Sequence, residues 1–167
     1  MPKRCACYLL TLILSIATLT IIIFKAPDLA ELNLKTITVN QLQTTISNTN
    51  RPKLIFIFAS WCGCCREKLA KLCQSANKYK NMDFILLSID QNSEKLQDLL
   101  KSGIRTRAHI YQLEYPRRSI LLNELSNIGI NFDGFVPFVV LLDSDNKKLE
   151  HQHISIQELD LAIQKIL

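Results

Sequence analysis

The chain has 167 residues, a length that suits one ordinary domain with a small appendage. Hydrophobic residues make up 48% of it and charged residues 21%, a balance that excludes an intrinsically disordered protein. The formal net charge of +5 is modest, and apolar residues interrupt the basic cluster at residues 105–118, so the cluster indicates a solvated face and no nucleic-acid partner.

The first 27 residues are predicted to form a single-pass membrane anchor. Residues 8–24 are uncharged and apolar, with Lys3 and Arg4 before them and Lys25 after them. This run of 17 residues lies between the core of a signal peptide, roughly 7–15 residues, and a spanning helix of about 20. No small-x-small cleavage pattern follows, which favours an uncleaved anchor over a cleaved signal peptide. The basic N-terminal flank predicts that this end stays in the cytoplasm.

Residues 28–167 are then predicted to form one domain on the outer side of the cytoplasmic membrane, facing the periplasm or exterior. Apolar runs of strand length alternate with amphipathic stretches, which indicates an α/β fold with a parallel core. Turn residues at 143–146 join the last two strands into a hairpin, so the central sheet is expected to be mixed, with flanking helices. The expected strands are 36–39, 54–58, 84–89, 109–113, 138–142 and 148–153. The expected helices are one capped by Asn40, then 65–79, 94–101, 117–125 and one opened by a capping box at 155–158.

Cys62 and Cys65 have C-x-x-C spacing and lie where the buried strand 54–58 gives way to a helix. Unpaired N–H groups and the positive end of the helix dipole stabilise a thiolate at that position, and Arg66 adds positive charge. The thiolate is the species that attacks a disulfide. This pattern predicts that Cys62 attacks a substrate and that Cys65 resolves the mixed disulfide. A C-x-x-C pair alone also fits half a zinc site or an ordinary disulfide.

The segment 58–65, which reads FASWCGCC after an apolar strand, resembles the active-site segment of thioredoxin-like proteins. A second similarity is Gly134-Phe135-Val136-Pro137, directly before the apolar strand 138–142. The resemblance covers residues 36–167 and implies that Pro137 is a cis-proline facing the active-site pair, with the Val136 backbone pairing with substrate. The residues it marks are Cys62 and Cys65 as catalytic, Trp61, Val136 and Pro137 as substrate-binding, and Gly63, Cys64 and Arg66 as accessory.

The predicted anchor and the separation of 75 positions from Cys62 to Pro137 make the chain similar to the membrane-tethered TlpA/ResA-type branch of that superfamily. This resemblance implies a reductase of disulfides in exported proteins, with cytochrome c maturation among its processes. It also implies a membrane electron donor that recharges the dithiol and no cofactor. No dimerisation signal is visible in the sequence, so a monomer is expected.

Three positions depart from the family pattern. Cys64 stands where many relatives have proline, Phe56 stands where thioredoxins usually have a buried acid, and Phe138 stands where threonine is common. These departures leave the direction of electron transfer open. Cys73 lies about 12 Å along the helix from Cys65, too far for a disulfide, and is predicted to be a buried core thiol.

Two other functions remain open. Cys62, Cys64 and Cys65, with one of His109, His151 or His153, could hold copper or zinc as in a metallochaperone, although no histidine shows ligand spacing to the cysteines. A non-catalytic tethered binding module with a structural disulfide is the other possibility. An aromatic residue at position 61, beside the first cysteine, has no evident use in such a module.

Overall fold

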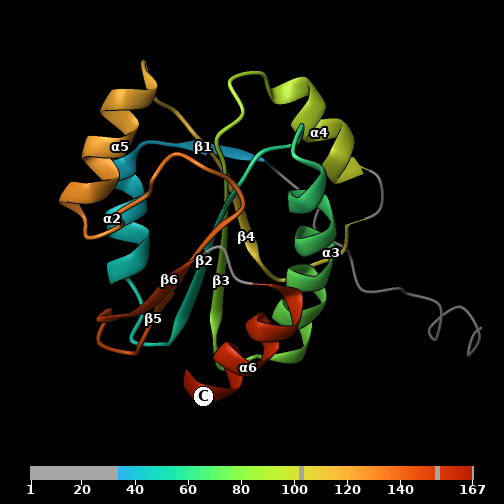
Figure 1. Ribbon diagram of the computed structural model, residues 1–167, viewed down its shortest axis with the longest axis vertical. Helices are drawn as coiled ribbons and strands as arrows, with labels where there is room; N and C mark the ends of the chain where they lie inside the picture. Colours follow the sequence, from blue (N-terminus) through green and yellow to red (C-terminus); the bar gives the residue numbers. More distant parts are fainter. Residues whose placement is uncertain (1–33, 102–103, 153–154, 167) are drawn as a thin grey trace, which may run out of the picture. The chain divides into compact units, whose positions relative to one another are not determined.

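The computed structural model describes residues 34–101, 104–152 and 155–166 (Figure 1). The predicted anchor at residues 1–27 lies outside these ranges. In the part of the chain that is described, no helix has the length and apolar character needed to cross a bilayer.

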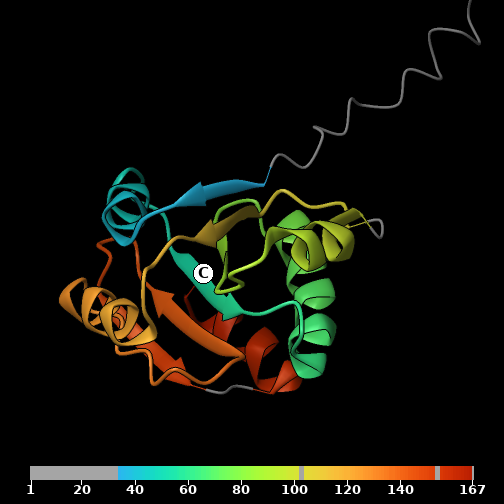
Figure 2. The same ribbon diagram turned by 90° about the horizontal axis from the view of Figure 1, so that it is seen from above.

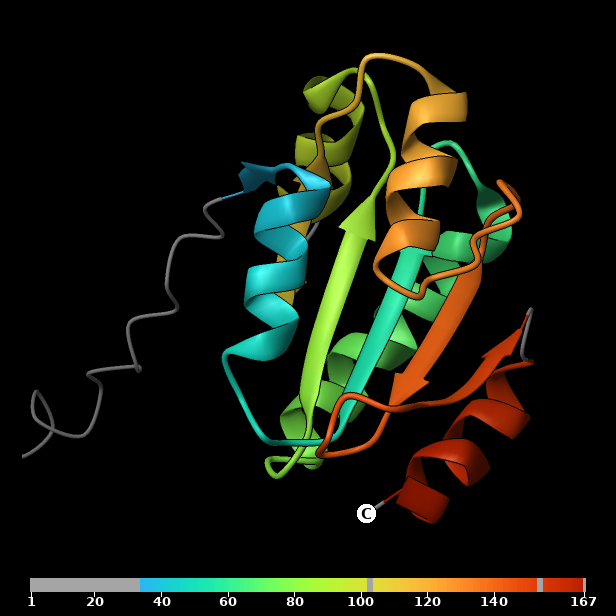
Figure 3. The same cartoon turned by 90° about the vertical axis from the view of Figure 1, so that its left-hand side faces the viewer.

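Within the described residues, six strands form one mixed sheet in the order β1-β4-β3-β2-β5-β6. The strands β1, β4, β3 and β2 run parallel to one another, whereas β5 is antiparallel to β2 and β6 is antiparallel to β5 (Figure 3). The predicted parallel core with a closing hairpin is confirmed. The strands are β1 (Lys35–Ile37), β2 (Lys53–Phe58), β3 (Asp83–Ser88), β4 (His109–Leu113), β5 (Phe138–Leu142) and β6 (Lys148–Gln152).

In the part of the chain that the structure describes, five helices cover the two faces of this sheet. In Figures 1 and 2, α2 and α5 lie on one side, and α3, α4 and α6 lie on the other. An ion pair of 3.8 Å between Lys71 and Asp160 joins α3 to α6. The helices are α2 (Val39–Ser47), α3 (Gly63–Lys78), α4 (Ser93–Lys101), α5 (Arg118–Asn127) and α6 (Ile156–Ile166).

The central strand β2 is buried along its whole length, which the continuous apolar run at residues 54–58 predicts for all of it except Lys53. Ile55 and Ile57 belong to the core under α2 and α5. Phe56 and Phe58 alternate with them, so they face the side of α3, and their rings stack with centroids 5.7 Å apart. Burial on both faces fixes the end of β2, and with it the position of the segment that follows.

Two helix starts, those of α2 and α3, differ by two residues from the sequence-based expectation. Thr38, not Asn40, caps α2: Gln41 N–H donates to Thr38 Oγ1 (3.3 Å), while Thr38 N–H donates to Gln41 Oε1 (2.9 Å). The strand ends early because Val39, at 2% exposed, packs into the core as the first helical residue. The helix α3 begins at Gly63, two residues before the predicted start, because Cys62 serves as its cap.

Candidate active site

The segment between β2 and α3 presents Cys62 at the first turn of a helix of 16 residues. Cys62 N–H donates to Ala59 O (3.1 Å), which closes a tight turn after the strand. Cys65 N–H points at Cys62 Sγ (3.2 Å), and Cys62 O accepts from both Cys65 and Arg66. The outer sulfur therefore receives a backbone N–H and the positive end of the helix dipole, which is the arrangement that stabilises a thiolate.

Cys62 and Cys65 form a disulfide with their Cα atoms 5.2 Å apart. Cys62 is half-buried, whereas Cys65 is fully buried. An attacking group can therefore reach the outer sulfur only. The buried Cys65 can react with the Cys62 sulfur without itself contacting the substrate.

The loop before β5 faces this pair. The Val136–Pro137 peptide bond is cis, as the resemblance implies, and Val136 O lies 3.8 Å from Cys62 Sγ. Residues 74 positions apart in the sequence thus meet at one end of the sheet. A polypeptide attached to Cys62 would have the exposed edge of the Val136 backbone beside it.

A family model described as thioredoxin-like matches residues 50–148, which is more than half of the chain. The chain belongs to the thioredoxin-like family. A curated rice protein (Oryza sativa subsp. japonica), Thioredoxin-like 3-3, is 31% identical over 61 residues. That match covers 36% of this chain and 47% of the rice protein, so the chain spans about half the length of this relative.

Solved structures share the fold of this thioredoxin-like domain. One is a secreted disulfide oxidoreductase of Mycobacterium tuberculosis (TM-score 0.55, 12% identity, 70% of this chain and 83% of that one). Another is a thioredoxin family thiol:disulfide interchange protein of Chlorobium tepidum (0.58, 14%, 74% and 83%). A third is StoA of Bacillus subtilis (0.52, 16%, 70% and 84%). The fold is therefore that of known thiol–disulfide oxidoreductases, and this chain carries a disulfide-forming cysteine pair within it.

The thioredoxin-like domain has a buried acid near the active site, although not at the position held by Phe56. Asp90 follows β3 and is 5% exposed. Its carboxylate accepts from Ser60 N–H (2.8 Å), Ser60 Oγ (2.9 Å) and Ser88 Oγ (2.5 Å). Phe58 pairs with Ser88 at the carboxyl ends of β2 and β3, which brings Asp90 beneath the turn that carries Cys62. The sequence offered one signal for it, a polar residue directly after a buried strand.

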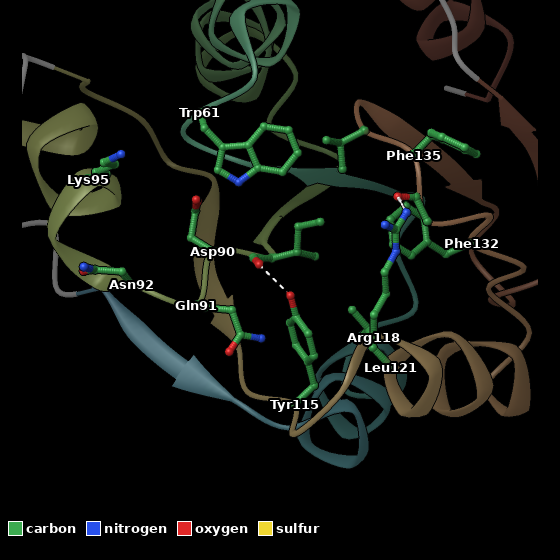
Figure 4. A pocket seen from close by; sticks show the side chains of 13 residues that line it. Trp61, Asp90, Gln91, Asn92, Lys95, Tyr115, Arg118, Leu121, Phe132 and Phe135 are labelled. Carbon is green, nitrogen blue, oxygen red and sulfur yellow. Dashed lines mark hydrogen bonds between the residues drawn. The ribbon is translucent and has the colours of Figure 1, made fainter.

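A pocket of about 610 Å³ opens beside the cysteine pair (Figure 4). Trp61 lines it and is 65% exposed. Sequence reasoning assigned Trp61 and Val136 to substrate binding, and the structure places both on this pocket. Sequence reasoning missed the other lining residues, which come from α4, α5, Tyr115 and the segments around residues 89–92 and 132–135. No local pattern marks those residues, because they meet only through the fold.

The accessory positions lie on the open side of the first turn of α3. Gly63, Cys64 and Arg66 are all exposed. Cys73 is 4% exposed, and burial raises the pKa of its thiol to about 11, against a smaller opposing effect of a hydrogen bond with Thr106. The prediction of a buried core thiol at Cys73 is confirmed. Phe138 begins β5 and packs edge-on against Phe132, with ring centroids 5.3 Å apart.

The donor set for a metal does not assemble in the part of the chain that the structure describes. No three side chains of histidine, cysteine, aspartate or glutamate come together there in a metal-binding arrangement. His109 is on β4 and stacks with Tyr111, the ring centroids being 6.3 Å apart. The backbone of His151 lies in β6, and His153 lies outside the described residues.

Proposed function

We propose that this protein is a membrane-tethered thiol–disulfide oxidoreductase that acts on exported proteins. The observation that carries the proposal is the position of Cys62, at the N-terminus of α3 and 3.8 Å from the carbonyl before a cis-proline. This places a polarised sulfur beside a backbone edge that can pair with a substrate. The thioredoxin-like family and the fold it shares with disulfide oxidoreductases support the same chemistry.

In the reducing direction, the Cys62 thiolate attacks one sulfur of the substrate disulfide. A Cys62–substrate bond forms, the substrate S–S bond breaks, and the leaving thiolate takes a proton from solvent. The buried Cys65 thiol then loses its proton and attacks Cys62 Sγ, which releases the second substrate thiol. Two electrons pass from the cysteine pair to the substrate, one substrate thiol takes its proton from solvent, the other is balanced by the proton that Cys65 loses, and the Cys62–Cys65 disulfide remains. Oxidation of a dithiol substrate follows the same steps in reverse.

The test of this chemistry is a trapping series with the full-length protein and insulin as the disulfide substrate. We expect Cys62→Ser to abolish exchange, and Cys65→Ser to accumulate a mixed disulfide through Cys62. Cys64→Ser is the matched control. The double variant Cys64→Ser/Cys65→Ser should still accumulate the mixed disulfide through Cys62. Exchange that survives Cys62→Ser at the wild-type rate would refute the proposed mechanism.

We further propose that the dithiol works as a reductant, recharged by a membrane electron donor, with cytochrome c maturation among its uses. The support is the anchor-like run at residues 8–24 and the resemblance to the TlpA/ResA-type branch. Equilibration of the Cys62–Cys65 pair with glutathione buffers measures its potential. A value below about −220 mV agrees with a reductase, whereas a value near −120 mV makes the protein an oxidant.

The proposed topology has its own test, because Cys64 is exposed. A membrane-impermeant maleimide added to intact spheroplasts should label Cys64 and leave Cys5 and Cys7 unlabelled, as mapped by mass spectrometry. Permeabilised cells provide the control, in which all three thiols should be labelled. Labelling of Cys5 and Cys7 before permeabilisation would contradict the orientation.

A further inference from the structure

The pocket beside the cysteine pair is large enough for substrate side chains. Its volume of about 610 Å³ falls in the usual range of binding pockets, roughly 300–1,000 Å³. We call it the Trp61–Arg118 pocket and define it by six of its lining residues. These are Trp61, Asp90, Lys95, Tyr115, Arg118 and Phe135.

The exposed large apolar side chains that line the Trp61–Arg118 pocket are two aromatic rings. Trp61 is 65% exposed and Phe135 is 67% exposed, and both line the pocket (Figure 4). Beneath them the wall is held rigidly, because Tyr115 Oη donates to Ile89 O (2.8 Å). Exposed large apolar side chains that share one pocket mark an interaction site rather than a solvated surface.

The charge of the pocket is positive. Lys95 enters it from α4, and Arg118 enters it from α5 on the opposite wall (Figure 4). Asp90 also lines it, but this carboxylate is 5% exposed and accepts hydrogen bonds from Ser60 and Ser88 on both of its oxygens. The accessible charges are therefore the two cations, and a carboxylate is their natural complement.

Arg118 is held in place by the loop before the cis-proline. Its Nη2 donates to Gly134 O, and its guanidinium carbon lies 6.0 Å from the centre of the Phe135 ring. A guanidinium has five N–H donors, of which Gly134 O takes one. The group is thus oriented in advance, which lowers the entropic cost of binding an anion.

One residue that lines the pocket also contacts the reactive sulfur. Val136 lines it, and Val136 O is 3.8 Å from Cys62 Sγ. A substrate chain bonded to Cys62 and lying along Val136 therefore passes the pocket within one or two residues, since an extended residue spans about 3.3 Å. Those neighbouring residues are the ones whose side chains can enter.

We propose that the Trp61–Arg118 pocket selects substrates in which an apolar and an acidic residue lie beside the reactive cysteine. This inference rests on the proposed function and names the substrate class of that site. The rings of Trp61 and Phe135 take the apolar side chain, and Lys95 and Arg118 take the carboxylate. Because both cations are solvent-exposed, the preference for acid over base should be roughly 3- to 10-fold.

The test compares two peptides, Gly-Leu-Asp-Cys-Gly and Gly-Leu-Lys-Cys-Gly, each as its symmetrical disulfide. Symmetry gives the same leaving group whichever sulfur is attacked. The second-order rate with reduced full-length protein is divided by the rate with dithiothreitol, which removes the intrinsic effect of charge on the disulfide. We expect the acidic peptide to react faster, and raising NaCl from 0.02 to about 0.5 M to shrink the preference.

Lys95→Glu is the decisive variant, and Lys80→Glu is its matched control. Both lysines are exposed, but Lys80 lies beyond the C-terminus of α3, about 24 Å along that helix from the active site. Lys95→Glu should lower the ratio of acidic to basic rates at least threefold, and Lys80→Glu should leave the ratio unchanged.

Bis(2-hydroxyethyl) disulfide, a small neutral substrate, separates the two hypotheses. If the protein exchanges with none of these disulfides, the proposed function fails. If it reacts with the neutral disulfide but shows equal normalised rates for both peptides, the pocket inference alone is overturned. The same holds if the acidic peptide reacts faster but neither Lys95→Glu nor added salt changes the ratio of the two rates.

Discussion

The guanidinium of Arg118 lies directly against the backbone of Gly134. Arg118 Nη2 donates to Gly134 O, and a Cβ atom added to Gly134 would lie 2.5 Å from that nitrogen. Gly134 also has φ of +87°, a conformation that L side chains rarely adopt. This contact ties α5 to the loop that carries Val136, and therefore couples one wall of the pocket to the position of the carbonyl beside Cys62.

A series of three glycine substitutions should separate the effects of backbone strain and steric contact. Gly134→Ala has both, Gly129→Ala has strain alone at φ of +83° with open space around the site, and Gly63→Ala has neither. We expect Gly129→Ala to cost about 1–3 kcal/mol of the free energy of unfolding, Gly134→Ala to cost more, and Gly63→Ala to cost nothing measurable. Urea denaturation of the oxidised protein measures all three.

Only Gly134→Ala should also slow exchange at Cys62, because it displaces either Arg118 or the loop before Pro137. Equal stability of the Gly134 and Gly129 variants would show that Arg118 moves aside freely and does not hold the loop.

The two free cysteines of the described residues should differ sharply in reactivity. Cys64 is exposed, whereas Cys73 is buried with a thiol pKa of about 11. At pH 8 only about one Cys73 thiol in a thousand is ionised, and that fraction rises about tenfold for each unit of pH. Iodoacetamide should therefore modify Cys64 and spare Cys73 in the folded oxidised protein, as read by peptide mapping. Denaturation in urea is the control, and Cys73 labelling as fast as Cys64 without urea would contradict the structure.

The order of strands and helices was predictable because the local pattern of apolar residues indicates which segments are buried. Residues 54–58 of β2 and 84–87 of β3 are continuously apolar, and the structure buries every residue of both strands. The position of Cys62 at a helix start followed from the change of periodicity after β2. The cap of α2 was placed wrongly, because Thr38 and Asn40 are both good capping residues and only the packing of Val39 decides between them.

The pocket and the buried acid could not be predicted in the same way. Asp90 and Ser60 are 30 residues apart, and Arg118 and Gly134 are 16 residues apart. Contacts of this kind arise from strand order and helix placement, which no local pattern encodes. The family pattern pointed to position 56 for an acid, but Phe56 is fully buried and stacked on Phe58.

The buried lysine at the start of β2 should be a determinant of stability. Lys53 is fully buried, and its Nζ donates to Thr49 O (2.6 Å), Arg51 O (2.9 Å) and Asn146 Oδ1 (2.6 Å). Lys53→Met fills much of the same volume but leaves three acceptors without a donor. We expect a loss of about 2–4 kcal/mol in the free energy of unfolding, measured with urea. The matched surface change Lys80→Met should leave the free energy of unfolding within about 0.5 kcal/mol of wild type. If Lys53→Met also left the free energy of unfolding unchanged, water would have replaced the ammonium group as the donor to the three acceptors.

Two substitutions at Asp90 should tell whether this acid positions the active-site turn or transfers protons. Asp90→Ala removes the acceptor of Ser60 N–H, so we expect a loss of about 1–3 kcal/mol in stability and slower exchange at Cys62. Asp90→Asn keeps an oxygen that can accept from Ser60 N–H and Ser88 Oγ, and its amide can donate to Ser60 Oγ.

If Asp90 acts only by holding the turn, the asparagine variant should keep most of the stability and an exchange rate within about threefold of wild type. Its pH–rate profile should also match that of wild type. Urea denaturation and stopped-flow exchange with insulin, across a range of pH, provide both readouts. A variant that folds normally but loses exchange would contradict the positioning role, because the carboxylate itself would then carry a proton to or from the cysteine pair.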